Sequence, residues 1–197
     1  MRVSIKPYAC CRYNHGLIDC MLALRPQFAI SDVARIRLGV LSGGALLVAD
    51  PIEQKRAPVG VVDAQFSAPY AAAAALVFGR GDISVYSGEC LSDPDVRGLM
   101  AVTECYRDET LDADYPRRWP AAASIELRNG QVLSTRVEYA TGEPENPVSR
   151  EALIAKFVSL AERADAEVLA ARLLALDTAE DLGAVEDALS DQPVSVS

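Results

Sequence analysis

Two different spacings of apolar residues open the chain. Between His15 and Leu24, apolar side chains at positions 17, 18, 21 and 22 share one face, which predicts a helix. Asn14 can cap this helix, and Pro26 ends it because proline cannot continue the helical hydrogen-bond ladder. From Val33 to Leu41 apolar residues alternate with arginine and glycine, which predicts a half-buried strand.

Turns and one strongly apolar helix follow. Residues 42–44 (Ser-Gly-Gly) predict a turn, and residues 50–58 predict a polar loop. An alanine-rich stretch over residues 69–78 predicts a helix, with Asp63 as a candidate cap. Gly79 ends that helix, since glycine readily takes the left-handed conformation found at helix ends.

The next segment combines a helix with a strand. Asp93 begins the helix, because an acidic cap followed by proline is typical of a first helical turn. Residues 102–107 then read as a short strand.

A β-hairpin is predicted over residues 125–139, around Asn129-Gly130. A two-residue loop would place Leu133 on the face away from Ile125. A three-residue loop, residues 128–130, instead pairs Ile125 with Leu133 on one face. Burial of a single face decides the register, so we expect the longer loop, with Gly130 in a left-handed bulge.

Two helices end the chain after a polar linker over residues 142–147. Ser149 caps the first of them. The apolar positions are Leu153, Ile154, Phe157, Leu160 and Ala161 in the first helix and Leu169, Leu173 and Leu176 in the second. We expect the tail after Asp191 to be frayed.

This order of elements mixes strands and helices without strict alternation. It predicts an α+β fold: a two-layer domain with an antiparallel sheet and helices, followed by a C-terminal helical extension. The predicted parts are residues 1–141 for the α+β domain, 142–191 for the helical segment and 192–197 for the tail.

Composition and charge narrow the class of protein. Half of the 197 residues are apolar and 24% are charged, as in globular proteins, and no apolar run is long enough to span a membrane. No secretion signal opens the chain, so we expect a cytoplasmic protein. The net charge of −9 argues against nucleic-acid binding. Residues 1–60, however, carry eight basic and four acidic side chains, which suits a small anion.

The five cysteines favour neither a disulfide framework nor a metal centre. Their number is odd and none forms a C-x-x-C pair, and a single histidine, His15, is present to complete a zinc site. No spacing suits an iron–sulfur cluster. We therefore expect buried free thiols in a reducing compartment, with no metal and no cofactor.

Candidate chemistry lies in four segments, residues 6–15, 63–70, 91–97 and 142–147. Each has a simple structural explanation when taken alone. Lys6 and Arg12 could be solvated charges, His15 could help to cap its helix, and Tyr70 could be a core ring.

Together and in this order, the runs K-P-Y-x-C-C-R-x-x-H and D-A-Q-F-S-x-P-Y resemble the MmgE/PrpD family. Its members include 2-methylcitrate dehydratase, cis-aconitate decarboxylase and iminodisuccinate epimerase. The resemblance extends from Lys6 to about Ala161. It implies the family's C-terminal lid domain and the helical return segment, without the N-terminal helical domain. We therefore expect a partner chain to supply that domain, or the domain to have been lost.

The resemblance also implies a reaction. Family substrates are small di- and tricarboxylates, and the chemistry is metal-independent dehydration, with decarboxylation or epimerisation as further possibilities. Lys6 and Arg12 would bind substrate carboxylates, and His15 and Tyr70 would be catalytic proton-transfer groups. The lyase hypothesis predicts that Lys6, His15 and Tyr70 line one outward-facing cleft.

The expected partners are a small polycarboxylate and a second copy of the chain, a helical-domain chain, or both, with no nucleic acid and no membrane. The alternative, from a different class, is a catalytically inactive remnant or a binding or dimerisation module of the same fold.

Overall fold

The computed structural model describes residues 3–161, 163–178, 183 and 186. Contacts divide the chain into two compact units, Met1–Val148 and Ser149–Ser197. The division into three parts made from the sequence stays a prediction.

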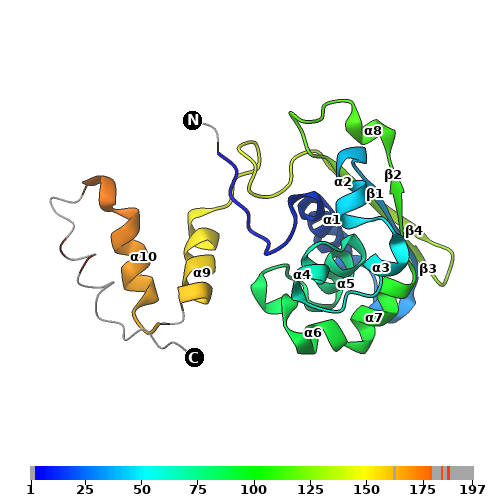
Figure 1. The fold of residues 1–197 in the computed structure, drawn as a ribbon, viewed down its shortest axis with the longest axis horizontal. Coiled ribbons are helices and arrows are strands. Elements are labelled where there is room, and N and C mark those ends of the chain that lie inside the picture. Colours follow the sequence, from blue (N-terminus) through cyan, green and yellow to red (C-terminus); the bar gives the residue numbers. More distant parts are fainter. Residues whose placement is uncertain (1–2, 162, 179–182, 184–185, 187–197) are drawn as a thin grey trace. The chain divides into compact units, whose positions relative to one another are not determined.

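The described residues of unit 1 form four strands and a set of short helices (Figure 1). The strands are β1 (Val33–Val40), β2 (Thr103–Arg107), β3 (Ala121–Leu127) and β4 (Val132–Val137). The α-helices are α1 (His15–Leu24), α2 (Ser42–Val48), α3 (Ile52–Lys55), α4 (Val61–Gln65), α5 (Ala68–Phe78), α6 (Gly88–Ser92), α7 (Pro94–Ala101) and α8 (Glu109–Asp112). Short 3-10 turns are η1 (Arg12–Asn14), η2 (Arg25–Gln27), η3 (Ile30–Asp32) and η4 (Ile83–Tyr86).

The strands form one mixed sheet in the order β2-β1-β3-β4. This confirms the α+β class, and the predicted antiparallel pairing holds for β1 with β3 and for β3 with β4. The pairing of β1 with β2 corrects the expectation, because these strands run parallel. The chain between them makes a long crossover through helices α2 to α7, and such a connection returns the second strand in the same direction.

The two faces of the sheet differ in character. Helix α1 packs on β3 and β4, α5 contacts β2, and α7 contacts β1. Ile36, Leu38 and Ile125 are buried in the resulting core. The opposite face is charged, with Arg35 lying 3.7 Å from Glu104 in an exposed ion pair. Alternation of side chains along β1 produces this division, as its sequence predicts.

The hairpin of β3 and β4 has the predicted register. Ile125 lies opposite Leu133. The Leu127 amide donates to the Gln131 carbonyl at 2.8 Å, which closes a three-residue loop. Gly130 takes a left-handed φ of +87°. Both expectations for this loop are confirmed.

Helix starts were predicted less well than strands. Residues 42–44 begin helix α2 rather than a turn. A Cβ on Gly44 would lie 2.2 Å from Cδ1 of Tyr13, so this glycine serves close packing against a ring. Asp63 lies inside α4 and does not cap α5, whose cap is Ser67. The predicted loop over residues 50–58 contains the short helix α3.

Helix α1 has the predicted bounds but not the predicted cap. Asn14 has helical backbone angles because η1 runs directly into α1. Its side-chain amide instead donates to the carbonyls of Gln65 and Ser67, at 3.3 and 3.4 Å. The side chain therefore joins two segments of the chain instead of closing a helix end.

Unit 2 contains α9 (Arg150–Ala161), α10 (Ala166–Leu174) and η5 (Leu176–Thr178). Ser149 accepts a hydrogen bond from the Ala152 amide at 3.1 Å, in agreement with its predicted capping role. Leu176 lies in η5, beyond the end of α10. The predicted fraying after Asp191 falls outside the described residues. None of the described helices combines the length and the apolar content needed to cross a membrane.

Candidate functional site

The segment over residues 4–11, here called the Lys6 loop, is tied to distant parts of unit 1. Near its start, the Ile5 amide donates to the Gly142 carbonyl at 2.8 Å. At its end, the Cys11 amide donates to the Gln65 carbonyl at 2.9 Å. The side-chain amide of Gln65 donates in turn to the Ala9 carbonyl at 2.8 Å. These hydrogen bonds fix the conformation of a segment that has no regular secondary structure.

These bonds join the two motifs that the sequence singled out. Gln65 belongs to the run D-A-Q-F-S-A-P-Y and contacts the run K-P-Y-A-C-C-R-Y-N-H at both Ala9 and Cys11. The side chain of Asn14, in the run K-P-Y-A-C-C-R-Y-N-H, donates a hydrogen bond to the carbonyl of Ser67, in the other run. The two motifs therefore form one structural unit, although more than 50 residues separate Asn14 from Ser67 along the chain.

Lys6 is exposed at the surface of its loop. Its Nζ donates to the Cys10 carbonyl at 3.1 Å, which closes the loop on itself. An ammonium group has three hydrogen-bond donors, and this contact uses one of them.

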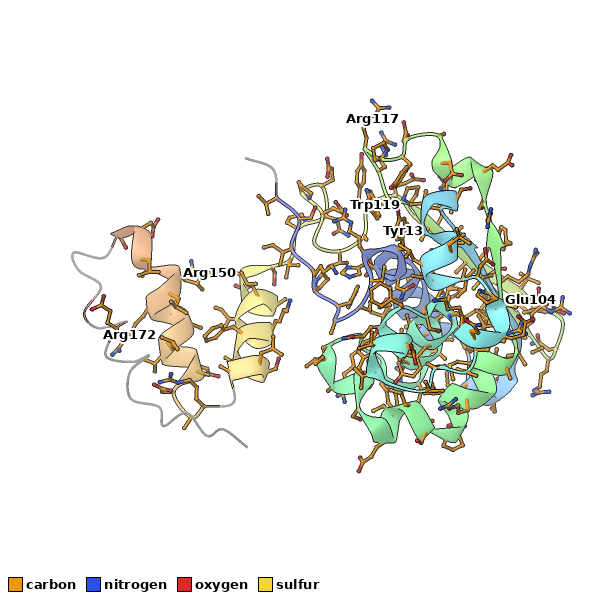
Figure 2. The ribbon with its side chains drawn as sticks, in the orientation of Figure 1. Tyr13, Glu104, Arg117, Trp119, Arg150 and Arg172 are labelled. Atoms are coloured by element: carbon orange, nitrogen blue, oxygen red, sulfur yellow. The ribbon has the colours of Figure 1, made fainter. Side chains whose placement is uncertain are left out.

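Arg12 follows the Lys6 loop and forms an ion pair with Glu143, with 26% and 13% of the two side chains exposed. The centre of its guanidinium lies 4.7 Å from the centroid of the Trp119 ring, a cation–π contact. Figure 2 shows Tyr13 and Trp119 together, and their ring centroids are 4.6 Å apart. Burial, and then the hydrogen bond with Tyr115, raise the pKa of Tyr13 to about 12.

His15 lies in the first turn of α1 and is only 3% exposed. The Tyr8 ring meets it edge-on, with centroids 5.2 Å apart. The Tyr8 hydroxyl donates to Asp19, and burial together with that carboxylate raises the pKa of Tyr8 well above its usual value. A Cβ on Gly16 would lie 2.8 Å from the Ala121 Cβ, so α1 packs tightly against β3 at this point.

Tyr70 lies in α5 and is fully buried. Its hydroxyl donates to the Val85 carbonyl, and its ring packs on Tyr86 at a centroid distance of 5.5 Å. Burial is the main cause that raises the pKa of Tyr70 above its usual value. A phenol in this position holds η4 against α5.

The structure therefore separates the four predicted site residues into two groups. Lys6 is exposed and Arg12 is partly exposed, and both belong to the segment around the Lys6 loop. His15 and Tyr70 lie in the core. The expectation that Lys6, His15 and Tyr70 line one outward-facing cleft is wrong in this structure, because the imidazole and the phenol are covered by the chain's own residues.

A hollow of about 420 Å³ lies elsewhere, between α3 and α4, where Lys55, Asp63 and Phe66 are among the lining residues. It is lined by none of the four predicted site residues. Within the described ranges, no three His, Cys, Asp or Glu side chains gather closely enough to hold a metal ion.

The sequence did not indicate that Glu143 and Trp119 contact Arg12, or that Asp19 accepts a hydrogen bond from Tyr8. Residues 142–147 were recognised as a candidate segment and as a polar linker, but no role was given to Glu143. The partner of Glu143 is 131 residues away along the chain, so no local spacing could indicate the pairing.

Comparison with known proteins gives the family. The sequence profile of the MmgE/PrpD C-terminal domain matches residues 8–182. Arg12, His15 and Tyr70 lie inside the matched range, and Lys6 lies two residues before it. A search of curated proteins found no match to the chain. Because the profile covers most of the 197 residues, the chain belongs to the MmgE/PrpD family and represents its C-terminal domain.

Proposed function

We propose that this chain forms the carboxylate-binding side of a metal-independent lyase that acts on a small di- or tricarboxylate, as 2-methylcitrate dehydratase does. The family is broadly one of dehydratases and lyases. In this proposal a helical domain supplies the other side of the active site. A partner chain could carry that domain, and a homodimer of this chain is compatible with it.

The exposed Lys6 ammonium, held in a loop with a defined path, is the observation that carries the proposal. Removal of a proton beside a carboxylate builds negative charge on that group, and a fixed cation stabilises it. Arg12 follows on the same segment and offers a guanidinium, which can hold a carboxylate through two parallel hydrogen bonds.

A second domain is needed because the described residues place no predicted proton-transfer group at the surface. His15 and Tyr70 are buried. Their role in proton transfer stays a prediction from the family resemblance, and their burial favours a supporting role within this chain. The acid and base of the reaction would then come from the helical domain.

The apolar surface of unit 2 supports a helical partner. Leu160 and Val168 are more than half exposed. A groove of about 220 Å³ between α9 and α10 is lined by apolar side chains that include Ile154, Phe157 and Leu173. Exposed apolar surfaces of this kind mark sites of association.

Free thiols support a cytoplasmic location. None of the five cysteines forms a disulfide. Disulfides are rare in the cytosol, where thiols stay reduced.

Decarboxylation of a related acid, or epimerisation, would use the same carboxylate contacts and is the finer alternative within this proposal.

A non-enzymatic binding or dimerisation module is the second candidate. The observation in its favour is that Glu143 already pairs with Arg12, which reduces the charge available to a substrate. This candidate predicts a stable oligomer without turnover in any combination.

The test is reconstitution with a separately produced helical domain of a family dehydratase. The full chain is assayed alone and with that domain for formation of the conjugated double bond from 2-methylcitrate. We expect turnover only in the mixture, and Lys6→Ala should lower kcat/KM by roughly 10- to 100-fold, the loss of one charged contact.

Arg117→Ala is the matched control, because it removes a surface cation whose side chain is 81% exposed. It should leave kcat/KM unchanged. Efficient turnover by the chain alone would overturn the divided site. A stable dimer with no turnover in the mixture would favour the second candidate.

A further inference from the structure

The turn at Gly142 fits the start of the Lys6 loop closely. Gly142 has a left-handed φ of +95°. A Cβ at this position would lie 1.9 Å from the Ile5 carbonyl oxygen, so only glycine permits the approach. The Ile5 amide donates to the Gly142 carbonyl at 2.8 Å. The backbone directly before Lys6 is therefore fixed by a turn that lies near the C-terminal end of unit 1 in the sequence.

The next residue of the turn, Glu143, holds both ends of the same loop. One carboxylate oxygen accepts a hydrogen bond from the Ser4 hydroxyl at 3.1 Å. The other accepts from Nη2 of Arg12. Ser4 precedes Lys6 by two residues and Arg12 follows it by six, so a single carboxylate bridges the loop on either side of the lysine.

The turn itself is stiffened by its own hydrogen bonds. The Gly142 amide donates to the Asn146 carbonyl at 2.8 Å, and the Asn146 amide donates to Glu143 at 3.0 Å. The Asn146 side chain donates to the Tyr139 carbonyl at 3.0 Å, which ties the turn to the chain that follows β4. These hydrogen bonds therefore fix the backbone that carries Glu143.

We propose that Glu143 is a positioning residue that bridges Ser4 and Arg12 and so fixes the Lys6 ammonium and the Arg12 guanidinium for binding the carboxylates of one substrate. This inference rests on the proposed function and assigns Glu143 no contact with substrate. Its carboxylate holds Ser4 and Arg12 in fixed positions relative to one another.

The guanidinium keeps donors for a ligand in this arrangement. Glu143 engages Nη2, and a guanidinium carries five N–H donors in a planar fork. The Trp119 ring covers the guanidinium at 4.7 Å and restricts its rotation. Glu143 and Trp119 together define the plane in which Arg12 would meet a carboxylate.

The first test needs no turnover. Hydrogen exchange of the Ile5 amide is measured by NMR in the full chain and in Glu143→Ala, Glu143→Gln and Glu126→Ala variants. The acceptor of this amide, the Gly142 carbonyl, is unchanged in all of them. We expect Glu143→Ala to speed the exchange about ten-fold, and Glu143→Gln, which keeps an accepting oxygen, by less than about three-fold.

Glu126→Ala is the matched control. It also removes a glutamate that faces an arginine, with its Oε2 3.9 Å from Nη1 of Arg35, but on the exposed face of the sheet. It should leave the Ile5 exchange unchanged. Equal exchange in wild type and Glu143→Ala would overturn the proposal.

The single tryptophan supplies a second readout. Trp119 is the only one in the sequence, and Arg12 lies over its ring. Glu143→Ala should shift the emission of Trp119, because Arg12 loses its partner, and Glu126→Ala should not. Emission that stays unchanged in Glu143→Ala would count against a bridging role.

The reconstituted enzyme separates positioning from a merely structural role. Glu143→Ala should lower kcat/KM about ten-fold, with a raised KM as part of the loss, because Lys6 and Arg12 would no longer be held in position to bind the carboxylates. Glu143→Gln should restore most of the affinity. A loss of kcat alone, or no rescue by glutamine, would overturn the inference. If no mixture turns over, the proposed function fails, while the exchange and emission results still decide whether Glu143 holds the loop.

Discussion

At the scale of single residues, the environment of a side chain decides its role more than its type. Tyr70 and Lys6 were both candidates for chemistry, but Tyr70 is fully buried while Lys6 is exposed. Residue type shows which groups can transfer a proton or hold an anion. Whether such a group meets solvent depends on contacts with residues far along the chain.

Tyr70→Phe tests the structural role of this phenol. The change removes the hydrogen bond to the Val85 carbonyl and leaves that acceptor buried. The free energy of unfolding should therefore be about 1–3 kcal/mol lower than in the wild type. Urea unfolding followed by Trp119 emission measures it. Tyr106→Phe, at an exposed tyrosine of β2, should change stability by less than about 0.5 kcal/mol. Equal stability of wild type and Tyr70→Phe would contradict the assigned role.

A pair of glycines separates backbone strain from a steric clash. Gly130 and Gly142 both have positive φ, at +87° and +95°. A Cβ on Gly130 meets nothing within 4 Å, whereas one on Gly142 would lie 1.9 Å from the Ile5 carbonyl. Gly130→Ala should destabilise by about 1 kcal/mol from strain alone, and Gly142→Ala by at least about 3 kcal/mol. Urea midpoints of the two variants give the comparison, and similar values would refute it.

At the scale of elements, strands were predicted better than helix starts. β1, β2 and the hairpin register follow from alternation and from one glycine, which are local signals. The start of α2 at residues 42–44 did not, because Gly44 serves close packing against Tyr13 and not a turn. The cap of α5 was missed because the serine that supplies it follows the chosen aspartate by four residues.

Ser67→Ala tests that cap. Ser67 is buried, and its hydroxyl accepts a hydrogen bond from the Tyr70 amide at 3.0 Å and donates to the Lys55 carbonyl at 2.5 Å, in a partly buried contact. Loss of both bonds should destabilise by about 2 kcal/mol or more.

Ser87→Ala is the comparison, since Ser87 caps the short helix α6 at an exposed site. Its expected cost is about 0.5–1 kcal/mol, again from urea unfolding. A larger loss for Ser87→Ala than for Ser67→Ala would argue against the importance of the buried cap.

At the scale of the whole molecule, buried thiols predict how stability depends on pH. Burial raises the pKa of Cys10, Cys20 and Cys105 to about 12 each. In the unfolded chain a thiol ionises near pH 8.5. The folded state therefore holds more protons above that pH, and the stability present below it is lost as the pH rises towards 12. Each thiol contributes a slope of up to about 1.4 kcal/mol per pH unit.

Urea midpoints measured from about pH 8 to 10.5 check this sign, since stability should fall steadily over the range. Cys20→Ala should reduce the slope of stability against pH by the contribution of one thiol, up to about 1.4 kcal/mol per pH unit. A midpoint that stays constant up to pH 10.5 would contradict the raised pKa values.

The sequence by itself determined the α+β class, the antiparallel pairing within the sheet, the register of the hairpin, and the motifs that indicated the family. These properties depend on neighbours a few residues apart, through alternation, helical spacing and turn chemistry. The tertiary structure alone decided that β1 and β2 run parallel, that His15 and Tyr70 are buried, and that Arg12 meets Glu143. These properties depend on which distant segments exclude water from one another, and burial and charge pairing of that kind have no local signature.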